Sequence, residues 1–337
     1  MNVAIVGVSG YTGLELVKIL LRHPKFKLEI ITNQQGGIDI SKLHPSLLGV
    51  LEKEVKKTNV EEIAKNCELV FLALPHKQSM PLAKQFLQKG LKVVDLSADY
   101  RLELDTYEKY YCPHIDKQNL KQAVYGLPEF YEEDIKKAKL IANPGCYPSA
   151  SLLGILPFVP FLDENMPIFI DAKSGLSGAG KGLSENAHFV NINENSFAYD
   201  PLSHRHMPEI KEKIQILSKK SFEINFVPQL LPLTRGMLVS IYAILKDEYQ
   251  NLDTNKVLQK AYEDKKFIRL RENPVDIKST SGTNFCDIFA KSNKKGIFIN
   301  TSIDNLLRGA SSQAVLNANL MCGYEQSFGI EGLAYVP

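Results

Sequence analysis

Cys146, one of five cysteines in the chain, stands where its thiol could act as a nucleophile. The run Leu140 to Ala142 predicts a strand, and the apolar stretch from about Ser149 to Leu156 predicts a helix. Cys146 would then lie at the end of a parallel strand, where ligand sites form, and near a helix N-terminus. Such a terminus stabilises a negative charge by up to ~2 kcal/mol, which favours the reactive thiolate. A buried structural cysteine is the alternative interpretation.

A second polar segment, His204-Arg205-His206-Met207-Pro208-Glu209-Ile210, carries two of the seven histidines. Imidazole can act as general acid and base near neutral pH, and a guanidinium can bind a carboxylate or phosphate. The sequence does not orient the two rings, so His204 and His206 are both candidates for the proton carrier. The alternative is the start of a helix with solvated charges, Glu209 lying in its first turn.

Two further segments could bind an anion. Lys173 to Lys181 is rich in glycine and small residues, which can present backbone N–H groups to an anion, although a mobile surface loop would look the same. Arg235, between two predicted strands, is either an anion ligand or a surface charge.

The N-terminal half must supply the scaffold for a cofactor. Strands predicted at Val3 to Val6, Leu28 to Thr32, Leu69 to Leu74 and Val93 to Leu96 alternate with helices, which is typical of a doubly wound parallel sheet. A GxxGxxG loop from Gly7 to Gly13 follows the first strand directly. Glycines there allow a tight turn and a close approach to a pyrophosphate, so the loop predicts dinucleotide binding. A plain strand-to-helix turn is the alternative.

The end of the second strand bears on the choice of cofactor. It reads Thr32-Asn33-Gln34-Gln35, without the acidic residue that would bind the ribose 2′-hydroxyl of NAD. This favours NADP(H), although no arginine stands there to bind the 2′-phosphate. Lys42 is nearby, but a solvated surface lysine is the simpler interpretation.

The second half predicts a different sheet. Strands at 167–173, 222–229 and 237–245, and a hairpin of 285–290 with 296–301, indicate an α+β domain with a largely antiparallel sheet. A last helix, 307–322, would return to the first domain. We therefore expect a Rossmann-type dinucleotide-binding domain of residues 1–145 and 306–337, and a catalytic and oligomerisation domain of residues 146–305.

Composition excludes several classes of protein. The 337 residues suit two domains, and 40 basic against 38 acidic residues give no support for nucleic acid or membrane partners. No CxxC pair occurs, so neither a metal site nor a disulfide framework is expected. The N-terminus lacks the pattern of a signal peptide, which makes the cytoplasm the default location.

Seven segments together resemble the successive motifs of N-acetyl-γ-glutamyl-phosphate reductases, and they occur in the family's order. They are Gly7 to Gly13, Leu96 to Leu102, Tyr125 to Glu129, Asn143 to Pro148, Ser174 to Lys181, His204 to Ile210 and Asn305 to Asn317. The resemblance implies a cytoplasmic oxidoreductase of arginine biosynthesis. It would reduce N-acetyl-L-glutamyl 5-phosphate to the 5-semialdehyde and inorganic phosphate with NADPH, through a thioester on Cys146. A homo-oligomer, dimer or tetramer, is the family expectation.

The resemblance also implies the site residues. Cys146 would be the nucleophile, and His204 or His206 would carry the protons, with His204 preferred. The substrate-binding residues would be Arg101, Ser149, Ser177, Arg205 and Glu209. The cofactor-binding residues would be Gly7, Ser9, Gly10, Tyr11, Thr12, Gly13, Thr32, Asn33, Pro75, Ser97, Gly178 and Asn305.

Three rival functions are weighed against this one. A phosphorylating dehydrogenase of aspartate semialdehyde would share the fold and the nucleophile, but the segment from His204 to Ile210 argues against it. An aminoadipate-type enzyme with a carrier-bound substrate would need a basic patch, and none is evident in the sequence. A non-catalytic cofactor sensor would not need Cys146 and the two histidines. One departure from the family pattern is the missing arginine after the second strand.

Overall fold

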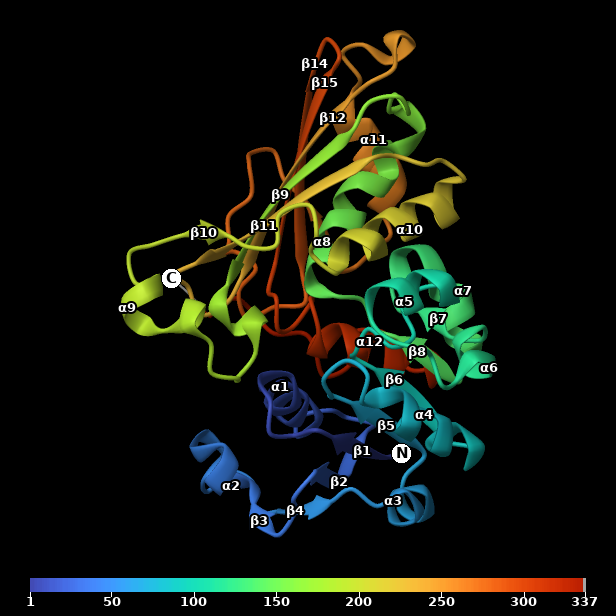
Figure 1. Ribbon diagram of the computed structural model, residues 1–337, viewed down its shortest axis with the longest axis vertical. Helices are drawn as coiled ribbons and strands as arrows, with labels where there is room; N and C mark the ends of the chain where they lie inside the picture. Colours follow the sequence, from blue (N-terminus) through green and yellow to red (C-terminus); the bar gives the residue numbers. More distant parts are fainter. Residues whose placement is uncertain (336–337) are drawn as a thin grey trace. The chain divides into compact units, whose positions relative to one another are not determined.

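The computed structural model describes residues 1–335, and the chain divides into two compact units (Figure 1). Unit 1 comprises Met1–Gly145 and Ala310–Glu331, and unit 2 comprises Cys146–Gly309 and the chain from Gly332 onward. Residues 306–309 and 332–335 thus cluster with unit 2, whereas the expected domain bounds put them in the first domain. The last two residues of that expected range, 336–337, lie outside the described residues.

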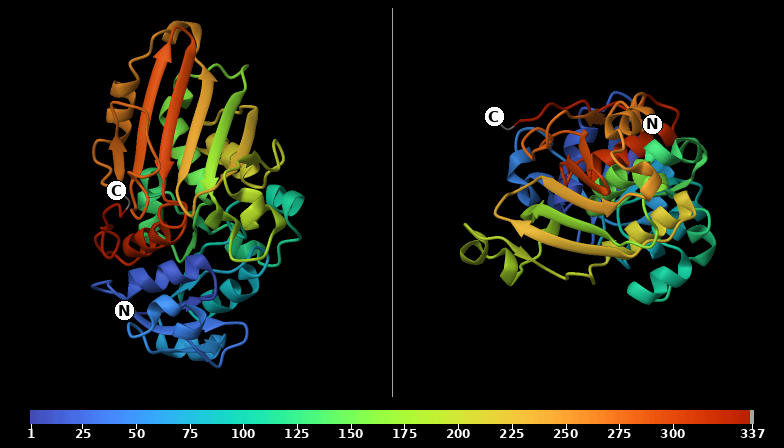
Figure 2. Two further views of the ribbon diagram at one scale, coloured as in Figure 1. Left: turned by 90° about the vertical axis from the view of Figure 1, so that its left-hand side faces the viewer. Right: turned by 90° about the horizontal axis from the view of Figure 1, so that it is seen from above.

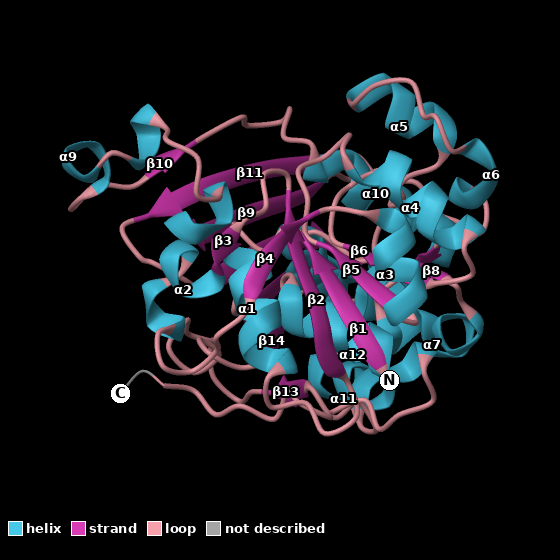
Figure 3. Ribbon diagram, turned by 90° about the horizontal axis from the view of Figure 1, so that it is seen from below, coloured by secondary structure: helices cyan, strands magenta, loops and turns pink. Residues whose placement is uncertain are grey.

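Unit 1 is built on an eight-stranded sheet of order β3-β4-β2-β1-β5-β6-β8-β7, in which only β3 and β4 pair antiparallel (Figure 3). The predicted doubly wound parallel sheet is therefore confirmed. Its strands are β1 (Asn2–Val6), β2 (Lys27–Asn33), β3 (Ile38–Asp39), β4 (Glu54–Lys57), β5 (Leu69–Leu72), β6 (Lys92–Asp95), β7 (Val124–Tyr125) and β8 (Leu140–Ala142).

Helices cover both faces of this sheet, which is why its central strands are apolar without alternation. β5, for example, is Leu-Val-Phe-Leu and buried throughout. The helices of unit 1 are α1 (Tyr11–Leu20), α2 (Ile40–Leu43), α3 (Val60–Asn66), α4 (Ser79–Gln88), α5 (Leu104–Tyr110), α6 (Lys117–Leu120), α7 (Pro128–Lys137) and α12 (Ser311–Met321), with a short 3₁₀ turn, η1 (Pro45–Leu47).

Unit 2 holds a seven-stranded sheet of order β10-β11-β9-β12-β15-β14-β13. It is largely antiparallel, as predicted, but β9 pairs parallel with β11 and β13 parallel with β14. Its strands are β9 (Ile168–Gly175), β10 (Phe197–Ala198), β11 (Ile224–Leu231), β12 (Met237–Ile244), β13 (Ile268–Leu270), β14 (Cys286–Asn293) and β15 (Gly296–Ile303).

One face of this sheet is covered by helices, and the left view of Figure 2 shows the strands side by side. Strand β12 alternates, with Met237, Val239, Ile241 and Ala243 buried and Tyr242 exposed, as expected for a half-covered sheet. The helical elements of unit 2 are α8 (Cys146–Ile155), η2 (Leu156–Phe161), η3 (Leu176–Ala179), η4 (Glu185–Ala187), α9 (Phe189–Ile192), α10 (His206–Ser218), η5 (Asp247–Tyr249) and α11 (Thr254–Tyr262). Through residue 335, the chain forms no helix with the length and apolar character that crossing a bilayer requires.

Two helix starts differ from the sequence-based bounds. Helix α8 begins at Cys146 rather than near Ser149, because a proline in the first turn, here Pro148, is compatible with a helix. Helix α12 begins at Ser311 rather than 307. The carboxylate of Asp304 accepts the backbone N–H groups of Leu306 and Leu307, and this turn keeps the preceding residues out of the helix.

Candidate active site

Cys146 is the first residue of α8, and its side chain is partly exposed. The helix dipole therefore favours a negative charge on the sulfur. Helix α8 is fixed to the sheet by contacts along its length. The Thr301 hydroxyl donates to the Ala150 carbonyl at 3.1 Å, and a Cβ on Gly154 would lie only 2.8 Å from the Thr301 methyl group.

Gly309 has no side chain, and this leaves room for the side chain of Cys146. A Cβ built on Gly309 would lie 2.6 Å from the Cβ of Cys146 and 2.6 Å from the carbonyl oxygen of Asn305. Real Cβ atoms do not approach other atoms so closely, so only glycine fits here. Sequence reasoning placed Gly309 in a motif but did not connect it with Cys146, since that contact spans more than 160 residues of chain.

The side chain of Asn305 forms hydrogen bonds to two other loops of unit 2. Its side-chain oxygen accepts the Gly236 N–H at 2.7 Å, and its amide nitrogen donates to the Ser177 hydroxyl at 2.9 Å. Gly178 lies beside it, since a Cβ there would be 3.5 Å from the Asn305 amide nitrogen. The structure thus brings together three predicted site residues, Ser177, Gly178 and Asn305, with both polar atoms of the Asn305 side chain bonded within the chain.

His204 is held in one orientation just before α10. Its Nδ1 accepts the backbone N–H of His206 at 3.0 Å. A backbone N–H can only donate, so the neutral ring carries its proton on Nε2. Burial lowers the pKa of His204 to about 4, while the charge of Asp200 opposes the shift and that of Arg205 adds to it. His204 is therefore neutral at physiological pH.

Aromatic rings surround the two histidines. The rings of His204 and His206 lie 4.8 Å apart, and the Tyr147 ring lies 5.7 and 5.8 Å from them. Tyr199 donates its hydroxyl to the Tyr147 hydroxyl at 3.0 Å. Burial raises the pKa of both phenols, and the nearby Cys146 charge adds to each shift. Both phenols therefore stay protonated beside the thiol. Sequence reasoning missed Tyr199, whose surroundings carry no motif.

The other predicted residues of unit 2 divide between exposed and buried positions. Arg205 is exposed as the N-cap of α10, whereas Glu209 in the first turn of that helix and Ser149 on α8 are buried. Arg235, whose role the sequence left open, forms an ion pair with the buried Asp304 at 3.6 Å. Burial raises the pKa of Asp304, and the Arg235 charge opposes that shift.

The glycine loop of unit 1 has the geometry that a dinucleotide needs. Gly7 has φ +98°, and a Cβ there would collide with the Ala73 carbonyl. A Cβ on Gly13 would lie 2.5 Å from the Gly7 carbonyl oxygen, whereas nothing lies within 4 Å of one on Gly10. Helix α1 begins at Tyr11 without a side-chain cap on its N-terminal N–H groups. The residues therefore fit a pyrophosphate, which would accept those N–H groups.

The end of β2 lies against the same loop. The Thr32 carbonyl accepts the N–H groups of Gly7 and Val8 at 2.9 and 3.2 Å, and the Asn33 amide donates to the Ser9 hydroxyl at 3.1 Å. His44, a buried residue that the sequence did not single out, contacts the Val8 carbonyl through Nε2 at 2.7 Å. His44 lies 36 residues from Val8 in the sequence, so no local pattern could predict this contact.

The remaining predicted residues of unit 1 support its backbone. Arg101 is buried, and its guanidinium donates to the carbonyl oxygens of Asn143 and Leu96, both at 2.7 Å. Asn143 lies in the segment that leads to Cys146. Ser97 is buried and donates to Asp95 at 2.7 Å, and the Pro75 carbonyl accepts the Gln78 N–H at 3.2 Å. Thr12 accepts the Ser311 hydroxyl through its carbonyl at 2.9 Å.

Family models match both halves of the chain. Residues 2–138 match the NAD binding domain of semialdehyde dehydrogenases, and residues 146–305 match their dimerisation domain. The chain is 58% identical to the N-acetyl-γ-glutamyl-phosphate reductase of Sulfurovum sp. (strain NBC37-1) over 337 residues, all of both chains. It is 58% identical to the enzyme of that name from Wolinella succinogenes, with 99% of this chain and 98% of the relative covered.

Solved structures of low sequence identity share the fold. Aspartate semialdehyde dehydrogenase II from Vibrio cholerae superposes with a TM-score of 0.73 at 18% identity, covering 96% of this chain and 98% of that one. A structure of aspartate semialdehyde dehydrogenase with NADP from Candida albicans gives 0.72 at 13% identity, covering 95% and 98%. These likenesses confirm the predicted two-sheet architecture.

Proposed function

The chain belongs to the N-acetyl-γ-glutamyl-phosphate reductase family, and we propose that it reduces N-acetyl-L-glutamyl 5-phosphate to N-acetyl-L-glutamate 5-semialdehyde with NADPH in arginine biosynthesis. The membership confirms the resemblance inferred from the motifs. It also makes the chain an oxidoreductase of the phosphorylating semialdehyde dehydrogenase class, with a nicotinamide-dinucleotide domain. The observation that carries the proposal is the setting of Cys146, first in α8 and followed by a tyrosine that contacts two histidine rings.

Cys146 supplies the covalent chemistry in this proposal. Its thiolate attacks the acyl phosphate carbonyl, a C–S bond forms, and the C–O bond to phosphate breaks as inorganic phosphate leaves. When bound, the reduced nicotinamide supplies the hydride that converts the resulting thioester to a thiohemiacetal. Cleavage of the C–S bond then releases the aldehyde and returns the Cys146 thiolate. Dividing the reaction in this way replaces one difficult displacement by two easier steps.

The two histidines take different parts in the proposed reaction. Neutral His204 has its only proton on Nε2, and its low pKa resists a second proton. It is therefore suited to donate a hydrogen bond to an oxygen that gains negative charge, and not to accept the thiol proton. We assign proton transfer to and from the Cys146 thiol to His206. The family resemblance had favoured His204 for this role, and we propose His206 in its place.

The cofactor would be held by the glycine loop and the end of β2. Backbone N–H groups at the start of α1 would bind the pyrophosphate, and Ser9 and Asn33 stand where β2 reaches the loop. The absence of an acidic side chain in residues 32–37 of the sequence favours NADP(H) over NAD(H).

The direct test is oxidation in the reverse direction. The purified protein, given phosphate and NADP⁺, should oxidise N-acetylglutamate 5-semialdehyde with a kcat/KM at least a hundredfold above that for aspartate semialdehyde or an aminoadipate semialdehyde. NAD⁺ in place of NADP⁺ serves as the matched comparison. A preference for aspartate semialdehyde would overturn the proposed substrate, and a clear preference for NAD⁺ would overturn the proposed cofactor.

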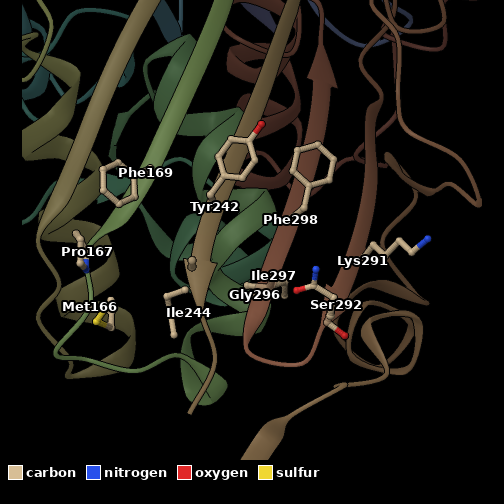
Figure 4. A pocket seen from close by; sticks show the side chains of 12 residues that line it. Met166, Pro167, Phe169, Tyr242, Ile244, Lys291, Ser292, Gly296, Ile297 and Phe298 are labelled. Atoms are coloured by element: carbon tan, nitrogen blue, oxygen red, sulfur yellow. The ribbon is translucent and has the colours of Figure 1, made fainter. Parts of the chain in front are cut away.

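We further propose that two copies associate through the uncovered face of the unit 2 sheet. Register places Phe169 opposite Tyr242 and Tyr242 opposite Phe298, so these rings lie on one face (Figure 4). Phe169 and Tyr242 are 51% and 49% exposed, and with Met166 and Ile244 they line an apolar hollow. An exposed apolar surface of this kind marks an interface. The match of residues 146–305 to a dimerisation domain supports a second copy as the occupant.

Sedimentation equilibrium tests this assembly. The wild type should sediment as a dimer or a larger even-numbered assembly, and Tyr242→Asp should shift it toward the monomer, because a charge would be buried in the interface. Lys260→Asp, at an exposed position of α11 and not in the lining of the hollow, serves as a control that should leave the mass unchanged. A monomeric wild type would contradict the proposal.

The cytoplasm is the proposed place of this reaction. Within residues 1–335, none of the five cysteines is joined to another in a disulfide. Proteins of reducing compartments rarely contain disulfides, and this agrees with the proposed location.

A further inference from the structure

The turn after β2 lacks the side chains by which such sheets usually distinguish NAD from NADP. An acidic residue there binds the ribose 2′-hydroxyl, and an arginine there binds the 2′-phosphate. Residues 32–37 of this chain read Thr-Asn-Gln-Gln-Gly-Gly and carry no charge. Any cation at this place must therefore come from another element.

The neighbouring strand β4 ends in two lysines beside that turn. It pairs in parallel with β2, so that Thr32 lies opposite Lys56 and Asn33 opposite Lys57. Residues opposite each other on paired strands project to the same face of the sheet. Lys57 therefore shares the face of Asn33, whose amide reaches Ser9 in the glycine loop at 3.1 Å. Lys56 projects to the other face.

The two lysines also differ in their partners. Lys56 forms an ion pair with Glu62 of α3 at 2.5 Å, and this contact raises the pKa of Lys56. Lys57 is exposed, and in residues 1–335 it forms no ion pair. The positive charge of Lys57 is thus available to a ligand, whereas that of Lys56 is already balanced.

The turn is built against the backbone of Lys57. The Asn33 side-chain oxygen accepts the N–H groups of Gln35 and Gly36 at 3.0 and 2.6 Å, which bends the chain sharply after β2. Gly36 has φ +70°, and a Cβ there would collide with the backbone nitrogen of Lys57. The turn, Ser9 and Lys57 are therefore neighbours around one end of the sheet.

We propose that Lys57 is the residue that recognises the 2′-phosphate of NADP(H) in this chain. It supplies from β4 the cation that the turn after β2 lacks, and Ser9 and the side chain of Asn33 lie on the same face as polar neighbours. This inference rests on the proposed use of NADP(H). It makes Lys57 a specificity residue with no part in the chemistry at Cys146.

Calorimetric binding of adenosine 2′,5′-bisphosphate and of 5′-AMP tests the inference without turnover. Wild type should bind the bisphosphate more tightly. Lys57→Gln should weaken bisphosphate binding about tenfold and make it less sensitive to salt, while 5′-AMP binding stays within about twofold. Lys56→Gln, one residue away on the same strand, is the matched control and should bind both ligands like wild type.

The outcomes separate the two proposals. If wild type prefers the bisphosphate and Lys57→Gln keeps that preference, the assignment of Lys57 is overturned while the use of NADP(H) stands. Equal weakening of both ligands in Lys57→Gln would also overturn it, because the lysine would then support the fold of the site. If wild type binds both ligands equally, the proposed cofactor preference fails, and the role of Lys57 fails with it.

Discussion

Replacement of Gly309 by alanine should reduce the reactivity of the Cys146 thiol more than it reduces the stability of the fold. The new Cβ would lie 2.6 Å from the Cys146 Cβ and 2.6 Å from the Asn305 carbonyl oxygen, against ordinary carbon contacts of about 3.5–4.0 Å. Relief of this overlap requires Cys146 to move by about 1 Å. Overpacking of that size costs about 1–3 kcal/mol of stability, and a 1 Å misplacement of a reacting group costs up to about 100-fold in rate.

Two measurements on Gly309→Ala separate these effects. The kcat for semialdehyde oxidation should fall by about 10–100-fold, and the rate of Cys146 alkylation by iodoacetamide should change with it. Urea unfolding should show a loss of no more than about 3 kcal/mol. Gly182→Ala is the matched control, because nothing lies within 4 Å of a Cβ there. Wild-type kcat and alkylation in Gly309→Ala would refute the argument that Gly309 sets the position of Cys146.

Two further predictions concern the cofactor loop and the pH dependence of stability. Gly13→Ala should weaken dinucleotide binding at least tenfold, since its Cβ would lie 2.5 Å from the Gly7 carbonyl oxygen; unchanged affinity in a fluorescence titration would contradict this. His204 titrates at about 4 in the folded protein and at about 6.5 when unfolded, so the unfolded chain binds more protons between these values. Stability is therefore retained above pH 6.5 and should fall by on the order of 3 kcal/mol as the pH drops to 4. The free energy of unfolding, measured with urea, should differ less between pH 7 and pH 4.5 in His204→Asn than in wild type. An equal difference in the two proteins would contradict the argument.

The architecture of unit 1 could be predicted because its central strands are buried on both faces. Val3 to Val6 was predicted and Asn2–Val6 is observed, and Leu140–Ala142 agrees to the residue. Continuous apolar runs with glycine turns leave few alternatives to a parallel sheet. The bounds of α8 and α12 were less predictable, because they depend on Pro148 fitting a first turn and on the side chain of Asp304.

Contacts between distant segments could not be predicted from the sequence. The motifs made Cys146 and the two histidines predictable as site residues. Tyr199, in contrast, reaches Tyr147 only because β10 pairs with β11. The pairing of Asn33 with Lys57 depends on the register of β2 and β4, which no local pattern specifies. The orientation of His204 likewise follows from one backbone hydrogen bond that no sequence pattern specifies.

The most direct test of the proposed thioester omits phosphate from the reverse reaction. With N-acetylglutamate 5-semialdehyde and NADP⁺ but no phosphate, the acyl group has no acceptor and should remain on the enzyme. We expect a burst of about one NADPH per chain and a single N-acetylglutamyl adduct on the peptide that contains Cys146, by mass spectrometry. Cys146→Ser should give neither, while it still binds the cofactor. Turnover by Cys146→Ser, or an adduct on another residue, would contradict the covalent mechanism.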